Sequence, residues 1–414
     1  MEESSIGTAG EDCATDSRQA GRDLFSLLLA ATAVDPSEAM MARVREALSG
    51  PFDWLGLLRT AGAHDVLGLL CHGLDRIAPE AVPDGIRVVL ELDADERARR
   101  AERVWAELVE ILSALERSSI AAIPFKGPVL ARLTYGDAGL RGCEDLDFLV
   151  RDADIDETIR VLQSMGYRDP GRARLTSGQF TAVRRLYGQW SLSHPARLMV
   201  EPHTTLAPST MAIDLDHESL WSRARTVTFD GTRLRVLSPE DHLLMLAIHG
   251  GKETWSQFRS VTDVDRLLAT APHIDWDAVW TRARDHGLLR MVRVALALAR
   301  RAFRTALPEE VDRGIATDRA APQLARTFLG RLERQDLKIP PMSRVSSLRF
   351  RLRERWSDRV NYAARTILTP RFEHYGMVRL PDRLIGLYVI PKLVHDYVLS
   401  PLWKVTRRRK RDSA

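Results

Sequence analysis

The chain has little cysteine and no visible targeting segment. Three cysteines, Cys13, Cys71 and Cys143, occur in 414 residues, and none of them forms a Cys-x-x-Cys pair. This scarcity argues against a disulfide framework or a zinc cluster and favours a reducing compartment. The first residues show no basic segment followed by an apolar stretch. We therefore expect no signal peptide and a cytoplasmic protein.

Long apolar runs are also missing, so the sequence predicts no transmembrane span. The best candidate, residues 384–403, is interrupted by two prolines, a lysine, a histidine and an aspartate. A spanning helix needs about 20 predominantly apolar residues. The Leu, Tyr, Val and Trp content of the segment is compatible with an interfacial helix. A packed C-terminal hairpin is the alternative that we favour.

Charge is distributed unevenly along the chain. The whole sequence has 60 Lys+Arg and 56 Asp+Glu, which is a net charge of +4. Residues 335–414 contain 18 Lys+Arg and 7 Asp+Glu, a net +11, so the remainder carries −7. The basic cluster at 404–411 is typical of a solvated tail. Contact of this tail with a polyanion, either a nucleic acid or an anionic membrane, is the alternative.

Periodicity predicts an α+β fold, in which helical regions flank a core with a mixed or antiparallel sheet. Apolar residues recur with helical spacing before about residue 118 and again from Pro239. Strand-forming segments lie between these regions, at 120–125, 145–150, 190–194, 198–203 and 227–236. We expect 190–194 and 198–203 to pair antiparallel, and 227–236 to form a hairpin. The predicted regions are 1–16 (disordered), 17–118 (helical), 119–237 (α+β core), 238–335 (helical, completing a cleft) and 336–414 (basic helical segment and tail).

Two aspartates at the start of the strand predicted over 145–150 carry the chemical signal. Residues two apart in a strand share a face, so Asp145 and Asp147 project together while the apolar residues between them face a core. Paired carboxylates suit Mg²⁺, whose octahedron substrate phosphates complete. The same Asp-x-Asp spacing occurs at 214/216 and 263/265. Spacing alone therefore leaves a metal site and a solvated strand edge as equal alternatives.

A two-metal site generally needs a third carboxylate from a neighbouring strand, and Glu201 is the best candidate. On a strand over 198–203, Glu201 and His203 share a face and Val200 faces away. Pro202 restricts this segment to a position where no ladder N–H is needed. An edge strand without ligands is the alternative.

A series of short motifs occurs in a fixed order. They are Phe125-Lys126-Gly127, Tyr135-Gly136-Asp137, Arg141, Asp145–Val150, Gly166-Tyr167, Glu201-Pro202-His203 and Leu237–Leu244, followed by His249, Trp255 and Asp263. The series resembles the uncharacterised bacterial nucleotidyltransferase-like family, which belongs to the DNA polymerase beta-type nucleotidyltransferase superfamily. The likeness covers about residues 20–405, and the order of the motifs is more specific than any single one.

The resemblance implies an enzyme with a nucleotidyltransferase-like core. It would use Mg²⁺ (or Mn²⁺) to move an NMP, with AMP from ATP as the first expectation, from an NTP to an acceptor hydroxyl or phosphate that the sequence does not identify. The roles that it implies are catalysis and metal binding for Asp145, Asp147 and Glu201, and phosphate binding for Lys126, Gly127 and Arg141. His203, His249 and Arg259 are candidates for substrate binding, with a core or capping histidine as the alternative for His249.

The turn departs from the superfamily pattern. Lys126-Gly127-Pro128 stands where Gly-Gly/Ser or Gly-Ser is usual, so the hydroxyl that would contact a phosphate is absent. Lys126 is either its replacement or a solvated lysine, and Arg141 is either a phosphate ligand or the partner of a nearby Asp. Three other functions stay open: a non-catalytic nucleotide-binding accessory protein, an RNA-modifying nucleotidyltransferase and an Asp-x-Asp glycosyltransferase.

Overall fold

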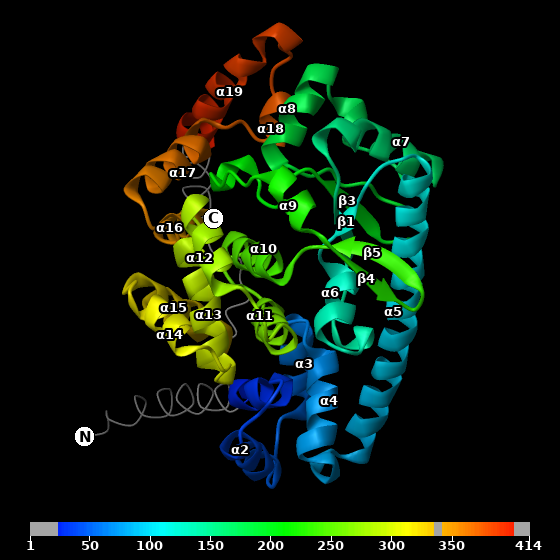
Figure 1. Cartoon of the computed structure of the whole chain (residues 1–414), viewed down its shortest axis with the longest axis vertical. Helices are drawn as coiled ribbons and strands as arrows, with labels where there is room; N and C mark the ends of the chain where they lie inside the picture. Colours follow the sequence, from blue (N-terminus) through cyan, green and yellow to red (C-terminus); the bar gives the residue numbers. More distant parts are fainter. Residues whose placement is uncertain (1–23, 335–341, 401–414) are drawn as a thin grey trace, which may run out of the picture.

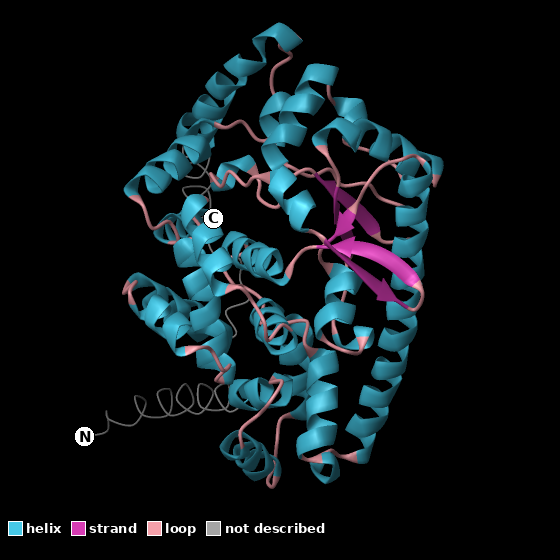
Figure 2. Ribbon diagram, viewed as in Figure 1, coloured by secondary structure: helices cyan, strands magenta, loops and turns pink. Residues whose placement is uncertain are grey.

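The computed structural model describes residues 24–334 and 342–400 of the chain. The predicted disordered segment 1–16 and the basic cluster 404–411 lie outside these residues. Helices dominate the described part, with a small mixed sheet and a separate hairpin (Figures 1 and 2). The predicted α+β class is therefore confirmed. None of the described helices is long and apolar enough to cross a membrane.

The N-terminal helices lead into one very long helix. They are α2 (Glu38–Leu48), α3 (Trp54–Ala63), α4 (Leu67–Ile77) and α5 (Asp84–Arg117). Asp53 caps α3 by accepting a hydrogen bond from the Gly56 backbone N–H at 2.8 Å. With 34 residues α5 spans about 50 Å, and it runs along one side of the molecule past the sheet (Figure 1).

The mixed sheet has three strands, β1 (Ile123–Pro124), β2 (Asp145–Leu149) and β3 (Met199–His203), in the order β1-β2-β3. Strand β1 pairs antiparallel with β2, and β3 pairs parallel with β2. The segment before β3 returns along it, through antiparallel bridges from Gln189 to His203 and from Leu192 to Val200. This confirms the antiparallel pair predicted from the sequence, and it means that β3 is covered on both edges.

Short helices and the predicted hairpin complete the α+β core. Strands β4 (Arg225–Phe229) and β5 (Thr232–Val236) pair antiparallel around Asp230-Gly231, as predicted. The helices of this region are α6 (Gly127–Thr134), α7 (Ile155–Ser164), α8 (Ser177–Tyr187) and α9 (His217–Arg223), with 3-10 turns η2 (Ala138–Leu140) and η5 (Ser209–Met211).

The rest of the described chain is helical. Ser238 caps the next helix by accepting a hydrogen bond from the Asp241 N–H, and Pro239 occupies its first turn. The helices are α10 (Pro239–Lys252), α11 (Arg259–Thr270), α12 (Trp276–Asp285), α13 (Leu289–Phe303), α14 (Glu309–Ala316), α15 (Ala320–Glu333), α16 (Met342–Arg351), α17 (Trp356–Leu368), α18 (Phe372–Tyr375), η6 (Asp382–Tyr388), α19 (Val389–Val394) and η7 (His395–Leu399).

Two apolar clusters take alternate residues of the sheet. Leu149 and Ile123 belong to the cluster that contains the N-terminal helices and α10, α11, α13 and α15. Leu146, Phe148 and Val200 belong to the cluster that contains the second half of α5 with α7 and α8. Because side chains alternate along a strand, Asp145 and Asp147 lie on the side of Leu149 and thus face the first cluster.

Because His242 is buried, we expect the folded protein to lose stability at low pH. Its Nε2 lies 3.2 Å from the Phe125 carbonyl oxygen, to which it donates a hydrogen bond beside the β1–α6 turn. Burial lowers the pKa of His242 from 6.5 to about 4. As the pH falls through this interval, only the unfolded chain takes up the proton, so the free energy of unfolding decreases, by about 3 kcal/mol at most.

We expect urea unfolding between pH 7.5 and pH 4.5 to show this decrease, and His242→Gln to reduce its slope, because glutamine can donate but does not titrate. Burial also lowers the pKa of His64 to about 4, so His64 keeps part of the slope in the variant. An unchanged slope in His242→Gln would contradict the assignment.

Candidate active site

The register of two parallel strands brings the predicted acidic residues together. Asp147 on β2 lies opposite Glu201 on β3, and Leu149 lies opposite His203. Neighbouring strands are about 4.8 Å apart, so side chains on one face of such a pair come into contact. Ligand atoms of Asp147, Glu201 and His203 all lie within 4.8 Å of one another. Asp145, two residues before Asp147, lies outside this group of three.

Asp147 is the most buried carboxylate of the cluster, with 3% of its surface exposed. His203 Nε2 lies 2.7 Å from its Oδ1, and Lys126 Nζ lies 3.4 Å from its Oδ2. Burial acts to raise the pKa of Asp147, but the Lys126 charge and the His203 hydrogen bond outweigh it and hold the pKa well below its ordinary value. Oδ2 accepts no hydrogen bond. Asp147 is thus an ionised carboxylate, and within the described residues its buried Oδ2 is paired only with the Lys126 ammonium.

Glu201 is oriented by donors that the sequence analysis missed. Gln189 Nε2 donates to Glu201 Oε2 at 2.7 Å, and the Ser191 hydroxyl donates to Oε1. His203 Nε2 lies 3.9 Å from Oε2. Both donors come from the segment that pairs antiparallel with β3. Strand alternation across the predicted pair 190–194/198–203 was the signal that could have identified Ser191, since it shares a face with Glu201.

Asp145 is half-buried, and it is the most accessible of the three predicted carboxylates Asp145, Asp147 and Glu201. Burial raises the pKa of Asp145, and the negative charge of Asp147 raises it further, while Lys126 partly offsets both. Two carboxylates on one strand face repel each other when both are ionised. A divalent cation between them would remove this repulsion.

The Lys126-Gly127 turn requires a glycine for two reasons. Gly127 has a φ of +53°, in the left-handed region that residues with a Cβ disfavour. A Cβ at Gly127 would also lie 2.9 Å from Cys143 Sγ. Cys143 in turn donates a hydrogen bond to the Asp145 carbonyl oxygen at 2.9 Å. The turn therefore packs against the residues that enter β2, and it carries the Lys126 ammonium to Asp147.

The two predicted arginines have carboxylate partners outside the cluster. Arg141 forms a buried two-pronged pair with Asp263, with 2.8 Å from Nε to Oδ1 and 3.0 Å from Nη2 to Oδ2. Tyr135 donates to the same Asp263 at 2.6 Å. Arg259 pairs with Asp65. The fork of Arg141 thus contacts an Asp, the alternative that the sequence left open, and its phosphate-binding role stays a prediction.

His249 lies with His203 at a small cavity beside the cluster. Lys126, His203, His249 and Lys252 line it, together with apolar side chains of α10 and of the segment after β3. Burial lowers the pKa of His249 well below its ordinary value, and the charges of Lys126 and Lys252 lower it further. The cavity volume is about 10 Å³, which is room for about one water molecule. A nucleotide therefore does not fit in this cavity unless the side chains that line it move. Asp145 lies on the other, more exposed side of the three carboxylates.

The sequence pattern of the family described as "Uncharacterised nucleotidyltransferase" matches residues 50–304, which is more than half of the chain. The chain belongs to this family. The resemblance stated from the motifs is thereby confirmed, and the family's description supports nucleotidyl transfer in general. Every residue of the cluster lies inside the matched segment.

The chain is also similar to solved structures, one of which is described as nucleotidyltransferase-like. It is the crystal structure of an antigenic nucleotidyltransferase-like protein from Paracoccidioides brasiliensis, with 14% sequence identity and a TM-score of 0.32; the match covers 52% of this chain and 93% of that one. No curated protein matches the sequence.

The geometry predicts that Arg141 supports the fold through Asp263. Arg141→Met would leave Asp263 buried without its counter-charge, so we expect it to lower the free energy of unfolding by roughly 3–5 kcal/mol. Arg103→Met is the matched control, because Arg103 pairs with Glu96 on the surface and such pairs contribute about 1 kcal/mol or less. Urea unfolding of both variants measures the difference. Equal, small losses would show that the buried pair has no special role.

Proposed function

We propose that this chain transfers a nucleotidyl group from an NTP, with ATP as the first candidate, to an acceptor hydroxyl or phosphate. Mg²⁺ (or Mn²⁺) would be the cofactor. The observation that carries the proposal is the β2–β3 register, which sets Asp147 opposite Glu201 two residues after Asp145. Membership of a nucleotidyltransferase family supports the reaction class.

The donor set fits a hard divalent cation. Three carboxylates from two adjacent strands are the oxygen ligands that Mg²⁺ prefers, and the buried Oδ2 of Asp147 accepts no hydrogen bond. Asp145, Asp147 and Glu201 would hold the cation. When bound, it would neutralise charge on the attacking and leaving oxygens of an in-line displacement.

The remaining residues position these groups. Gln189 and Ser191 orient Glu201 through both of its oxygens. Lys126 forms an ion pair with Asp147, and we propose that its ammonium turns to the triphosphate once a cation neutralises that carboxylate. Gly127 allows the backbone at the start of α6 to come close to a phosphate. His203 and His249 line the small cavity and would contact substrate once the side chains that enclose this cavity move.

A non-catalytic nucleotide-binding protein is the second candidate. It is favoured by the two donors already bound to Glu201. The absence of a hydroxyl in the Lys126-Gly127-Pro128 turn points the same way. The RNA-modifying alternative relies on the basic cluster at 404–411, outside the described residues, and stays a prediction, as does the glycosyltransferase alternative.

Asp147→Asn separates these candidates. The substitution keeps the shape of the side chain but removes its charge, so we expect Mg²⁺-dependent release of pyrophosphate from labelled NTP, in the presence of cell extract as acceptor source, to fall about 100-fold or more. Asp214→Asn is the control, because Asp214 has the same Asp-x-Asp spacing but pairs with Arg365 at the surface.

Full turnover in Asp147→Asn would contradict the proposal. A nucleotide-induced rise in the melting temperature of the wild-type protein, without any turnover, would establish the non-catalytic candidate instead. The position of the label in the extract identifies the acceptor.

A further inference from the structure

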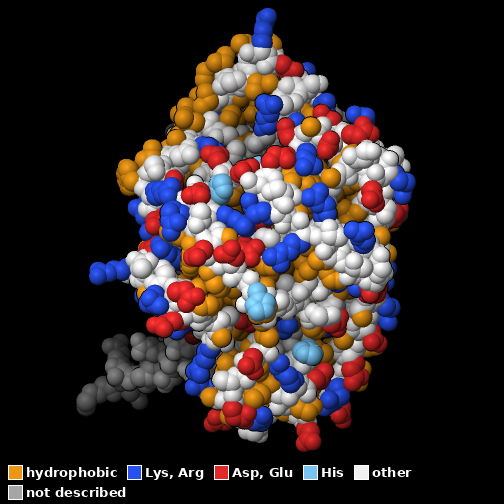
Figure 3. Space-filling model, viewed as in Figure 1, with side chains coloured by type: hydrophobic (Ala, Val, Ile, Leu, Met, Phe, Trp, Pro, Cys, Tyr) orange, Lys and Arg blue, Asp and Glu red, His pale blue; other side chains and the backbone are white. Residues whose placement is uncertain are grey.

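Exposed apolar side chains concentrate at the C-terminal end of the described chain. Eighteen large apolar side chains are exposed in the described residues, and thirteen of them lie between 356 and 399. The space-filling view shows hydrophobic side chains gathered along the edge where α17 and α19 lie (Figures 1 and 3). We call these thirteen the C-terminal apolar face: Trp356, Val360, Ile367, Leu368, Met377, Val378, Leu384, Leu387, Ile390, Val394, Tyr397, Val398 and Leu399.

The face follows helical spacing on separate elements. Val360 and Ile367 are seven residues apart on α17, with exposures of 52% and 41%. Ile390, Val394 and Tyr397 follow each other by four and three residues through α19 and η7, with exposures of 54%, 44% and 54%. Residues at these intervals lie on one side of a helix. The packed hairpin favoured from the sequence would have buried them.

Helix α19 is inverted relative to an ordinary surface helix. Lys392 is 2% exposed and its Nζ lies 2.9 Å from Asp396 Oδ2, on the inner side. His374 of α18 is fully buried, and its Nε2 lies 3.3 Å from Asp396 Oδ1. A helix in water normally buries its apolar side and exposes its charges. Polar groups inside and apolar groups outside indicate that the outer side contacts something other than water.

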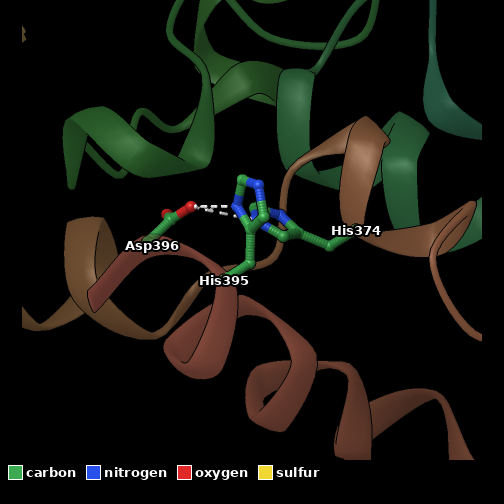
Figure 4. Close-up of side chains that lie close together, drawn as sticks. All are labelled: His374, His395 and Asp396. Carbon is green, nitrogen blue, oxygen red and sulfur yellow. Dashed lines mark hydrogen bonds and ion pairs between the residues drawn. The ribbon is translucent and has the colours of Figure 1, made fainter. Parts of the chain in front are cut away.

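The polar residues inside form an anchor and not a metal site. His374, His395 and Asp396 point toward one another (Figure 4), close enough to be considered as ligands. However, Lys392 and Arg371 both contact the Asp396 carboxylate, and two cations there repel a metal ion. His374 Nδ1 accepts a hydrogen bond from the Arg371 backbone N–H at 2.8 Å, which turns Nε2 to Asp396. The cluster therefore ties η7 and α19 to α18.

Polar contacts also tie the segment to the α+β core. Gln179 Nε2 of α8 donates to the Tyr388 hydroxyl at 2.7 Å, and Tyr388 donates to the Val378 carbonyl oxygen at 2.7 Å. Asp382 accepts a hydrogen bond from the Gly178 N–H at 3.0 Å. The C-terminal apolar face is thus presented outward by a segment that the core holds in place.

Charge distinguishes between the possible occupants of this face. Residues 342–400 contain 11 Lys+Arg and 5 Asp+Glu. Of these cations, Lys392 and Arg353 are buried, whereas Arg379 and Arg383 are exposed beside apolar residues of the face. Residues 404–411 add six Lys+Arg with no acid. A second copy of the chain would bring two such positive segments together. An anionic lipid surface would complement them, since apolar side chains enter the headgroup boundary while adjacent Lys and Arg bind anionic lipids. We propose that the C-terminal apolar face docks on an anionic membrane surface.

Flotation of the full chain with lipid vesicles tests this proposal. Vesicles of phosphatidylcholine with phosphatidylglycerol should carry the protein to the top of the gradient. Vesicles of phosphatidylcholine alone should bind it about tenfold or more weakly, and added salt should weaken binding to the anionic vesicles.

A matched pair of double variants isolates the face. Ile390→Asp/Val394→Asp places charges on it and should reduce anionic-vesicle binding about tenfold or more. Val88→Asp/Val89→Asp adds the same charges at exposed apolar positions of α5, with exposures of 54% and 51%, and should bind as the wild type does. Circular dichroism and melting temperature establish that both variants are folded.

Three results would overturn the proposal. The first is a failure of the wild-type chain to bind anionic vesicles. The second is binding of Ile390→Asp/Val394→Asp as strong as that of the wild type. The third is a wild-type chain that does not bind vesicles but forms a dimer in sedimentation, where Ile390→Asp/Val394→Asp is a monomer. The face would then be an interface between two copies of the chain.

Discussion

The parallel pairing of β2 with β3 is the constraint on which the candidate site depends. It places Asp147 opposite Glu201 and brings His203 to the same face. A shift of the β3 register by one residue would turn Glu201 toward the apolar cluster on the opposite face of the sheet, where Val200 now lies, and would bring Val200 to the site. Val200, Leu146 and Phe148 are fully buried on the opposite face, so any such shift would expose or displace core side chains. The packing of the core thereby specifies the chemistry of the other face.

A buried carboxylate cluster requires compensation, and the chain supplies it from several elements. Lys126 comes from the turn before α6, His203 from β3, and Gln189 and Ser191 from the segment beside β3. Only Lys126 among these brings a permanent positive charge close to Asp147. A bound cation would neutralise Asp147 in place of Lys126. The Lys126 ammonium would then be available to a phosphate group, so cation binding and phosphate binding would be coupled. Near the C-terminal end of the described chain charged groups are also buried, but there the apolar groups face outward.

Local pattern predicted much of this arrangement. Strand alternation indicated that Asp145 and Asp147 share a face, and that Glu201 and His203 do. Turn residues predicted the hairpin at 227–236. Long-range partners were beyond such reasoning: nothing local distinguishes an arginine that binds a phosphate from one that pairs with an aspartate 122 residues away, as Arg141 does. The inversion of α19 was equally hidden, since a Lys and an Asp four residues apart normally form a surface pair.

The most direct test of the account is to locate a divalent cation. Crystals grown with Mn²⁺ and a non-hydrolysable NTP analogue would reveal the ion by its anomalous scattering, independently of any acceptor. The account predicts ion density between Asp145 and Asp147, with Glu201 within reach and Lys126 turned toward the triphosphate. Nucleotide bound without an ion at these carboxylates, or an ion held elsewhere while Lys126 stays on Asp147, would contradict it.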